Sequence, residues 1–270
     1  MIKDGLYQAI GPGQPDIILT QHITNHKAGT IQIGYDHVLA GKKAFFITIH
    51  GVGGHASKPH LCIDPVVIAC SIVLKLQTII SRAVDPHDAA VVTCTSVATG
   101  REPNAIQDKA EITVDIRAFT THTLNHVVKA MERVVKAECD DCEVAPTIVE
   151  FDNIPPLEND ANATQAIEDQ FRAYYGDEVV QQLGPNMASD DDLPLLAPEG
   201  VPCSYWTIRS TDPELWDKYN EEGRLNELPN VGDASFAPGE GREDTLRTGI
   251  DSLAMAALTF LDTRPNKDQN

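Results

Sequence analysis

Hydrophobic and polar positions follow a regular succession of patterns between residues 43 and 150. Short β-branched runs predict strands, and longer runs with apolar residues at helical spacing predict helices. The predicted elements are a strand at 44–49, a helix at 64–82, strands at 89–100 and 110–119, a helix at 121–139 and a strand at 142–151. This β-α-β-β-α-β order predicts a ferredoxin-like sandwich that is compact by itself.

The segments on either side of this region have a different character. Before it, apolar runs predict strands at 15–22 and 29–36. After it, the patterns predict a helix near 162–175, a strand at 201–208, a loop-rich stretch to Pro238 and a final helix at 245–261. These elements resemble one half of a larger α/β layer. We therefore expect a partial α/β domain made of residues 1–42 and 151–270, with residues 43–150 inserted as a second domain.

Composition and charge exclude several classes of protein. The chain has 270 residues, 42% of them hydrophobic, but no apolar run of membrane-spanning length and no signal peptide, so we expect a soluble cytoplasmic protein. Its net charge of −19 is concentrated in residues 151–270, which hold 8 basic and 24 acidic side chains. Such a chain repels phosphate backbones, so we expect no nucleic-acid partner. Six dispersed cysteines are too few for a disulfide scaffold.

The segment HGVGGHASKPH at 50–60 places glycines and histidines between a predicted strand and a predicted helix. One interpretation is a glycine turn that carries solvated surface histidines. The other is a catalytic loop whose glycines let the backbone turn tightly near a ligand while a histidine reaches a substrate. The loop alone does not decide between the two.

Several motifs taken in order resemble one family of enzymes. They are Gly51–His60 as a G-x-G-G-H-x-S-x-P-H loop, Asp64–Val67 as D-P-V-V, residues 104–108 as an N-x-I-P-D-like piece, Arg117–Phe119 as R-x-F and Gln21–His22 as a Q-H pair. This series is similar to that of the dinuclear-metal amidohydrolases and metallopeptidases, the group of aminoacylase, hippurate hydrolase and the indole-acetyl-amino-acid hydrolases. The resemblance implies a metallopeptidase-type α/β domain with an inserted ferredoxin-like lid, through which two copies form a homodimer.

The resemblance also implies roles for three residues of the lid. His55 would be the donor that meets the developing oxyanion across the dimer. Asn104 and Arg117 would hold the carboxylate of the substrate, an N-acyl amino acid or related amide, and Arg suits this because its fork matches a carboxylate. The simpler alternatives are a solvated histidine at 55, a turn residue at 104 and a strand-end ion pair at 117.

By the same resemblance, His22 would be a ligand of a divalent metal, zinc or manganese, and its alternative is a packed histidine. The family's motifs for its other metal ligands and its general base, a C-G-H-D loop and a Glu-Glu pair, do not occur in this sequence. Gly232 stands where the family has a further ligand histidine, with Asp233 beside it. We therefore expect an N-terminally truncated chain that is inactive as it stands.

Two functions remain open from the sequence. One is a metal-dependent amidohydrolase of N-acyl amino acids, of which this chain is a part. The other is a non-catalytic, dimerising remnant that binds a carboxylate ligand.

Overall fold

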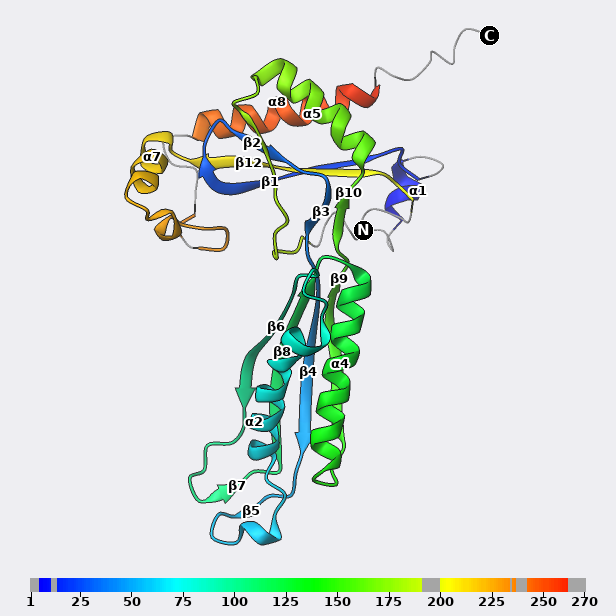
Figure 1. Cartoon of the computed structure of the whole chain (residues 1–270), viewed down its shortest axis with the longest axis vertical. Coiled ribbons are helices and arrows are strands. Elements are labelled where there is room, and N and C mark those ends of the chain that lie inside the picture. The colour runs from blue at the N-terminus through cyan, green and yellow to red at the C-terminus, as the bar shows by residue number, and fades with distance from the viewer. Residues whose placement is uncertain (1–4, 11–13, 191–199, 234, 237–241, 262–270) are drawn as a thin grey trace. The chain divides into compact units, whose positions relative to one another are not determined.

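The protein is represented by a computed structural model that describes residues 5–10, 14–190, 200–233, 235–236 and 242–261. The chain divides into two compact units (Figure 1). Unit 2 consists of residues 39–157 and 186–194, and unit 1 consists of the remaining residues. Within the described ranges, no helix is long and apolar enough to cross a membrane.

Unit 2 is built from a four-stranded sheet with helices on one of its faces, and from a small two-stranded sheet of β5 and β7. Its elements are β4 (Gly41–His50), β5 (Gly54–His55), η2 (Pro59–Leu61), α2 (Pro65–Leu76), α3 (Thr78–Ala83), β6 (Ala90–Ala98), β7 (Ala105–Ile106), β8 (Lys109–Ala118), α4 (Thr121–Asp140) and β9 (Pro146–Ile154). The sheet order is β6-β8-β4-β9, with every neighbouring pair antiparallel. This order confirms the predicted ferredoxin-like arrangement.

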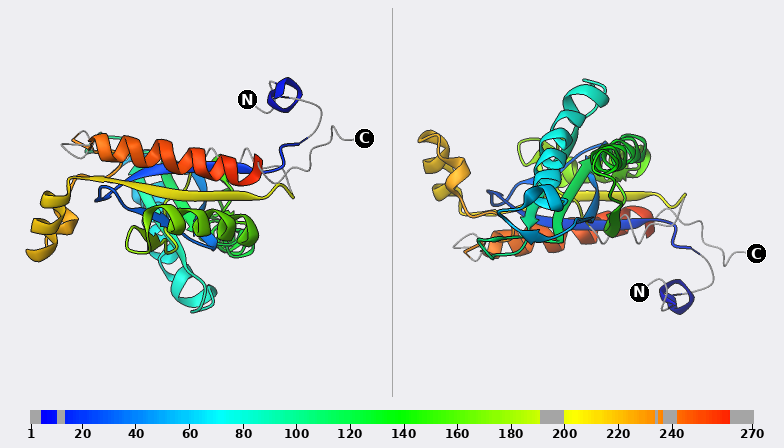
Figure 2. Two further views of the ribbon diagram at one scale, coloured as in Figure 1. Left: turned by 90° about the horizontal axis from the view of Figure 1, so that it is seen from above. Right: turned by 90° about the horizontal axis from the view of Figure 1, so that it is seen from below.

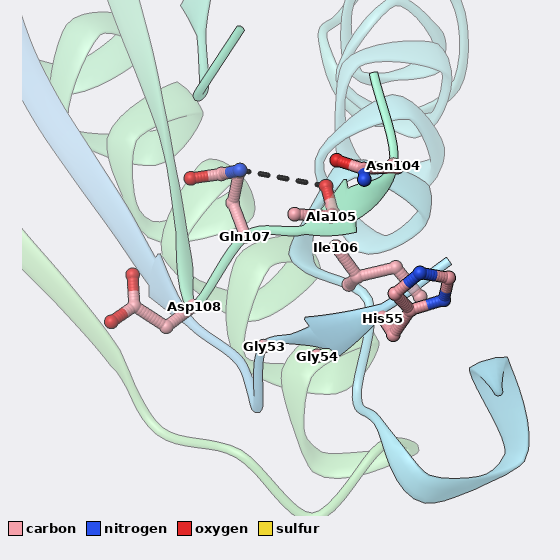
Figure 3. Close-up of a pocket in the computed structure, with 8 residues that line it drawn as sticks. All are labelled: Gly53, Gly54, His55, Asn104, Ala105, Ile106, Gln107 and Asp108. Carbon is pink, nitrogen blue, oxygen red and sulfur yellow. Dashed lines mark hydrogen bonds between the residues drawn. The ribbon is translucent and has the colours of Figure 1, made fainter. Parts of the chain in front are cut away.

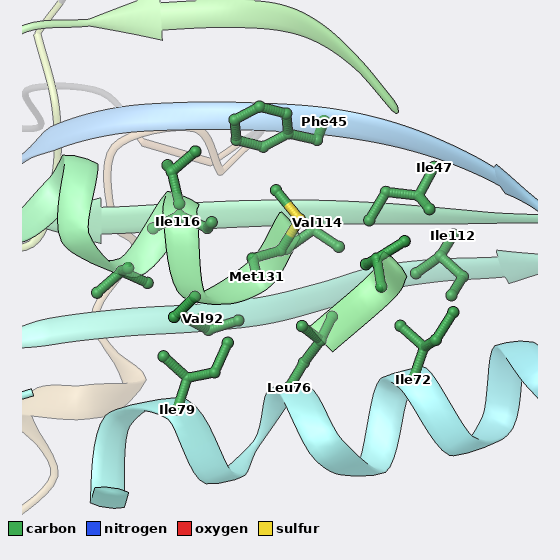
Figure 4. Close-up of a cluster of buried hydrophobic side chains, with 14 of the residues drawn as sticks. Phe45, Ile47, Ile72, Leu76, Ile79, Val92, Ile112, Val114, Ile116 and Met131 are labelled. Atoms are coloured by element: carbon green, nitrogen blue, oxygen red, sulfur yellow. The ribbon is translucent and has the colours of Figure 1, made fainter. Parts of the chain in front are cut away.

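The core of unit 2 lies between the sheet and its helices. Alternate residues of β4 and β8 point towards α2 and α4, and Ile47, Ile112 and Met131 are fully buried there (Figure 4). The start of α4 is fixed by Thr120, whose hydroxyl accepts a hydrogen bond from the Thr123 amide. The predicted helix at 64–82 divides at Gln77 into α2 and α3, although Gln77 itself keeps helical angles.

Unit 1 contains a mixed sheet. Its elements are α1 (Leu6–Ile10), β1 (Ile18–Lys27), β2 (Ile31–Ile33), β3 (Asp36–Leu39), β10 (Leu157–Asn159), α5 (Ala161–Tyr175), β11 (Val180–Gln182), β12 (Cys203–Thr211), α7 (Pro213–Glu221), η3 (Leu225–Glu227) and α8 (Arg242–Leu261). The sheet order is β1-β12-β2-β11, and β1 runs parallel to β12. The short strands β3 and β10 pair with each other where the chain passes between the units.

Helices α5 and α8 lie side by side over one face of the unit 1 sheet (Figures 1 and 2). Trp206 of β12 is fully buried beneath them and makes an edge-to-face contact with Phe171 of α5 at 5.5 Å between ring centroids. Its indole Nε1–H donates to Gln21 Oε1 at 3.1 Å. Strand side chains alternate between faces, so β12 residues on either side of Trp206 point to the opposite face.

The prediction of a loop-rich stretch up to Pro238 is wrong for part of its length, because α7 occupies Pro213–Glu221. The helix starts with local signals: the Asp212 carboxylate accepts from the Leu215 amide at 2.9 Å, and Pro213 occupies the first turn. Trp216 then packs against β1 by stacking on His26 at 4.4 Å between ring centroids.

The side chain of Asn159 makes hydrogen bonds inside unit 1 to backbone groups that would otherwise pair with another strand. Its side chain is buried, its amide donates to Gly34 O at 2.7 Å and Tyr205 O at 2.8 Å, and its Oδ1 accepts from Tyr205 N at 2.8 Å. It thereby satisfies three backbone groups that have no access to water.

We predict that Asn159→Ala lowers the free energy of unfolding of unit 1 by about 2–4 kcal/mol, because it leaves these three buried groups unpaired. Both tryptophans of the chain, Trp206 and Trp216, belong to unit 1, so urea unfolding followed by tryptophan fluorescence measures it. The matched control is Asn230→Ala, which removes one exposed contact to the Val231 amide in the same unit and should change stability by less than about 0.5 kcal/mol. Equal effects of the two variants would contradict the prediction.

Candidate functional site

The loop at 50–60 and the turn before β8 form a hollow at one end of unit 2. Strand β5 pairs with β7, which places His55 opposite Ala105, and the Ala56 amide donates to Asn104 O at 2.9 Å. The hollow has a volume of about 630 Å³ and is lined by Gly53, Gly54, His55 and residues 104–108 (Figure 3). Two of the predicted site residues, His55 and Asn104, are therefore neighbours here.

The glycines of the loop are required by close contacts. A Cβ at Gly51 would lie 2.3 Å from Ile63 O, and one at Gly53 would lie 2.8 Å from Ile106 O. Neither residue has a positive φ. Glycine is needed at both places because another segment of backbone passes too near for any side chain, which differs from the tight-turn role that the sequence indicates.

His55 is exposed and held by Ser57. Its Nδ1 lies 2.8 Å from Ser57 Oγ and accepts from the Ser57 amide at 3.2 Å. A backbone N–H only donates, so Nδ1 carries a lone pair and the proton of the neutral ring is on Nε2. The loop thus presents His55 as a hydrogen-bond donor through Nε2.

Arg117 lies at the far end of β8 from the hollow. The register pairs Lys109 with His50 at one end and Arg117 with Lys42 at the other. Its guanidinium makes a two-point contact with Asp115, at 2.8 Å and 3.4 Å, and donates to Met187 O at 2.8 Å. The structure therefore does not bring Arg117 together with His55 and Asn104 within unit 2.

His22 lies on β1 in unit 1. Its Nδ1 is 2.7 Å from Ile23 O, and a carbonyl only accepts, so the proton is on Nδ1 and Nε2 keeps its lone pair. Metal-bound histidines are generally held in this way, with the other ring nitrogen donating to a carbonyl or carboxylate. His22 is therefore prepared as a ligand through Nε2.

The described part of the chain does not complete a two-metal centre around His22. It contains no group of three or more His, Cys, Asp or Glu side chains placed to share a metal ion. The register pairs His22 of β1 with Thr207 of β12. Two residues further along both strands, on the same face of the sheet, Thr24 is paired with Arg209. A hydroxyl and then a guanidinium follow His22 along the sheet, and the guanidinium would repel a dication.

The region of Gly232 offers no substitute ligand in its present arrangement. Gly232 has a φ of +96°, a conformation that strains any other residue, and a Cβ there would meet no atom within 4 Å. The Asp233 carboxylate accepts from the Asn230 amide at 2.6 Å and closes a local turn. Residues 237 and 238, through which Gly232 was matched to the family's histidine, lie outside the described residues.

Arg209 was missed by the sequence analysis. It is only 4% exposed, and burial lowers its pKa to about 10, although the nearby Tyr205 acts in the opposite direction. Burial, and secondly the charge of Arg209, lowers the pKa of His26 to about 4. The available signal was a basic residue at the end of the apolar run SYWTIR (204–209), where a strand buried on both faces should have none.

Comparison with known proteins identifies the inserted unit. Residues 39–142 match the model of the M20 peptidase dimerisation domain. The N-acetyldiaminopimelate deacetylase of Bacillus subtilis is 39% identical over 124 residues, which cover 46% of this chain and 33% of the relative. The IAA-amino acid hydrolase ILR1-like 4 of Arabidopsis thaliana is 32% identical over 175 residues, covering 63% and 40%. The chain thus spans between a third and two fifths of these relatives.

Solved structures share the fold over nearly the whole chain. The YXEP protein of Bacillus subtilis, described as a dinuclear metal binding peptidase from the M20 family, matches with a TM-score of 0.64 and 21% identity, over 92% of this chain and 58% of that one. The aminobenzoyl-glutamate utilization protein of Klebsiella pneumoniae matches with a TM-score of 0.69 and 18% identity, over 92% and 56%. The chain therefore carries an M20 peptidase dimerisation domain within a mixed α/β fold of the M20 type.

We predict that neutral His55 carries its proton on Nε2, as its contacts to Ser57 require. Nitrogen-15 NMR of the histidine side chains distinguishes the two tautomers. His87 is an internal control with the opposite expectation, because its Nδ1 lies 2.9 Å from the Asp85 carboxylate, an acceptor, and so carries the proton. A dominant Nδ1–H form of His55 would show that the Ser57 contact does not orient the ring.

Proposed function

We propose that this chain is part of a metal-dependent amidohydrolase that cleaves the amide bond of an N-acyl amino acid or a related compound. The match of residues 39–142 to the M20 dimerisation domain carries the proposal. Two relatives at 32–39% identity are named for the hydrolysis of such amides, N-acetyldiaminopimelate and amino acid conjugates. The hollow beside His55 supports it, because it exposes a hydrogen-bond donor of the kind that amide hydrolysis needs.

In this proposal His55 serves the carbonyl oxygen of the substrate. Negative charge develops on that oxygen when water attacks an amide carbon, and a fixed N–H donor aimed at it lowers the barrier. The Nε2–H of His55 is such a donor, and Ser57 fixes the ring without competing for it. His55 would act on the substrate bound by the second protomer of a homodimer.

Asn104 and Arg117 would bind the carboxylate of the substrate. Asn104 stands beside His55, so the two side chains would contact one ligand together. Arg117 keeps Asp115 as its present partner, and a substrate carboxylate would have to share or replace that contact. Its Nη1 donates to Met187 O and Ser189 Oγ, so a substrate carboxylate that approached this edge would have to share or replace those contacts too.

We propose His22 as one ligand of a divalent metal, zinc or manganese. The remaining ligands are not supplied by the residues that the structure describes in this chain. We therefore derive no catalytic step through the metal, and we expect the 270-residue polypeptide alone to hydrolyse no N-acyl amino acid above background.

The same observation favours a second candidate function. A chain whose described residues hold one prepared metal ligand, but which keeps His55, Asn104 and Arg117, would be a non-catalytic dimer that binds a carboxylate ligand. An experiment on unit 2, the lid, distinguishes the two functions. Only the lid of an amidohydrolase should support turnover when it is joined to a complete metal-binding domain.

We propose that the chain forms a homodimer through unit 2. Strand β6 is an edge of its sheet, and the neighbouring helix α2 exposes Val67 and Leu74, with 65% and 71% of their surfaces accessible. An unpaired strand edge beside an apolar helix face is a surface that a second copy can cover by extending the sheet.

The proposed activity predicts that residues 39–142, placed in the corresponding region of the Bacillus subtilis N-acetyldiaminopimelate deacetylase, give an active chimaera. His55→Ala in that chimaera should lower kcat by roughly 10²–10³-fold, as expected for the loss of an oxyanion donor. His122→Ala changes an exposed histidine in the first turn of α4, which follows the end of β8 opposite the hollow. It is the matched control and should leave kcat unchanged.

Two further measurements complete this test. The unmodified 270-residue chain, assayed with zinc and with manganese, should remain at background. A well-folded chimaera without turnover, or one indifferent to His55→Ala, would favour the non-catalytic function. Turnover that follows the unmodified chain through purification and is lost in His22→Ala would show that its own residues complete the metal site.

The proposed dimer predicts that Leu74→Asp converts the protein to a monomer, because it places a charge in an apolar contact. Sedimentation equilibrium at about 10–100 μM, a range in which a specific interface of standard size is formed, measures the mass. Leu215→Asp changes a 41% exposed leucine of unit 1 and should leave the dimer intact. A monomeric wild-type protein at the highest concentration would refute the proposal.

A further inference from the structure

Unit 1 contains a buried positive charge that has no negative partner. Arg209 on β12 is 4% exposed and forms no ion pair with any acidic side chain in the described parts of the chain. Among the described residues its guanidinium has one hydrogen-bond partner, the Thr24 hydroxyl, to which Nη1 donates at 2.7 Å. Its Nε is fully buried and unpaired. This isolation is notable in a protein with a net charge of −19.

The surroundings of Arg209 are polar but neutral. Thr207, two residues earlier on the same face of β12, is 3% exposed and has a hydroxyl without a partner. Thr24 is the register partner of Arg209 on β1, and His26 lies near enough to feel its charge. His26 is uncharged at neutral pH, since its pKa is about 4. Among the described residues, the contacts of Arg209 on this face are thus made by hydroxyl groups and by no carboxylate.

An unpaired buried cation lowers stability because it has lost water without gaining an opposite charge. The two unpaired groups, Arg209 Nε and Thr207 Oγ1, lack an acceptor among the described residues of this face. One guanidinium neutralises one negative charge, which matches a carboxylate better than a phosphate carrying nearly two. The small exposed fraction of Arg209 favours a small molecule over the side chain of a folded partner.

We propose that Arg209, Thr24 and Thr207 form a binding site for a small carboxylate on the face of the unit 1 sheet opposite α5 and α8. This site is separate from Asn104 and Arg117, which belong to unit 2, and it does not depend on the proposed amidohydrolase activity. Because Arg209 is positively charged, this face favours the binding of an anion, whereas a metal site favours a cation.

The test uses the full chain and acetate as the probe, with acetamide as the neutral compound of the same shape. Thermal unfolding and isothermal titration calorimetry at constant ionic strength should show saturable stabilisation and binding by acetate and none by acetamide. Arg209→Met should weaken acetate binding at least about tenfold, the effect of losing one charge-assisted hydrogen bond. Without acetate, Arg209→Met should raise Tm by about 2–4 °C, because it removes an uncompensated charge.

Control variants separate this site from other sources of carboxylate binding. Arg224→Met, which removes an exposed arginine of unit 1 that pairs with Glu222 and Glu227, should bind acetate as the wild type does. All of these variants lie in unit 1, so failure of the proposed role of unit 2 leaves this test intact. Thr207→Val keeps the shape of the side chain, should weaken acetate binding, and provides the decisive measurement if Arg209→Met does not fold.

Three results would overturn the proposal. They are equal acetate binding by wild type and by Arg209→Met or Thr207→Val, equal effects of acetate and acetamide, and binding of a hexaglutamate peptide without binding of acetate. The last result would show that the missing acceptor is a protein carboxylate.

Discussion

The packing of α2 and α4 against one face of the β6-β8-β4-β9 sheet sets the position of the other functional features of unit 2. The loop that carries His55 connects β4 to α2, so both of its ends are fixed by that core. The outer face of α2 is exposed because its inner face, at Ile68, Ile72 and Leu76, is buried. A cavity in this core would therefore disturb the hollow and the proposed dimer surface together.

The two units differ in how their buried or half-buried arginines are neutralised, a difference that the hydrophobic pattern of the sequence does not show. In unit 2 the arginine of interest, Arg117, is balanced by Asp115 at its side. In unit 1 the buried Arg209 has no such balance among the described residues, and burial, followed by the charge of Arg209, lowers the pKa of His26. The same sheet face carries His22, prepared to bind a metal, and Arg209, which opposes one. These opposed preferences are a property of this chain's own residues, whatever the activity of its relatives.

The sequence predicted unit 2 well because its elements are long and strongly periodic. Leu124, Val127 and Met131 recur at helical spacing on α4, and all three are buried. Unit 1 was harder to predict, since β2, β10 and β11 have three residues each and carry no period that a pattern can reveal. Helix α7 has no buried residue and therefore no apolar face that a hydrophobic pattern could reveal. In the sequence, only the N-cap residue Asp212 and Pro213 in the first turn indicate the start of this helix.

The site residues divide in the same manner. His55 and Asn104 become neighbours through the backbone pairing of two-residue strands, which are too short to leave a pattern in the sequence. The Asp115 contact of Arg117 follows from its i−2 position on one strand face, and it was foreseen only as a general ion pair. Arg209 escaped notice because its isolation depends on tertiary partners that are absent, and a sequence shows only which residues are present.

The pairing of β1 with β12 has a consequence for the order of folding during synthesis. Ile18 and Cys203 are register partners, so β1 emerges from the ribosome 185 residues before the strand that completes it. Unit 2 lies between them and has its own core, so it can fold while β1 is still unpaired. Because β3 and β10 pair at its two ends, a folded unit 2 replaces a chain of more than a hundred residues by a short connection. The entropy of closing the sheet of unit 1 is thereby reduced, which makes the inserted unit an intramolecular aid to the folding of its host.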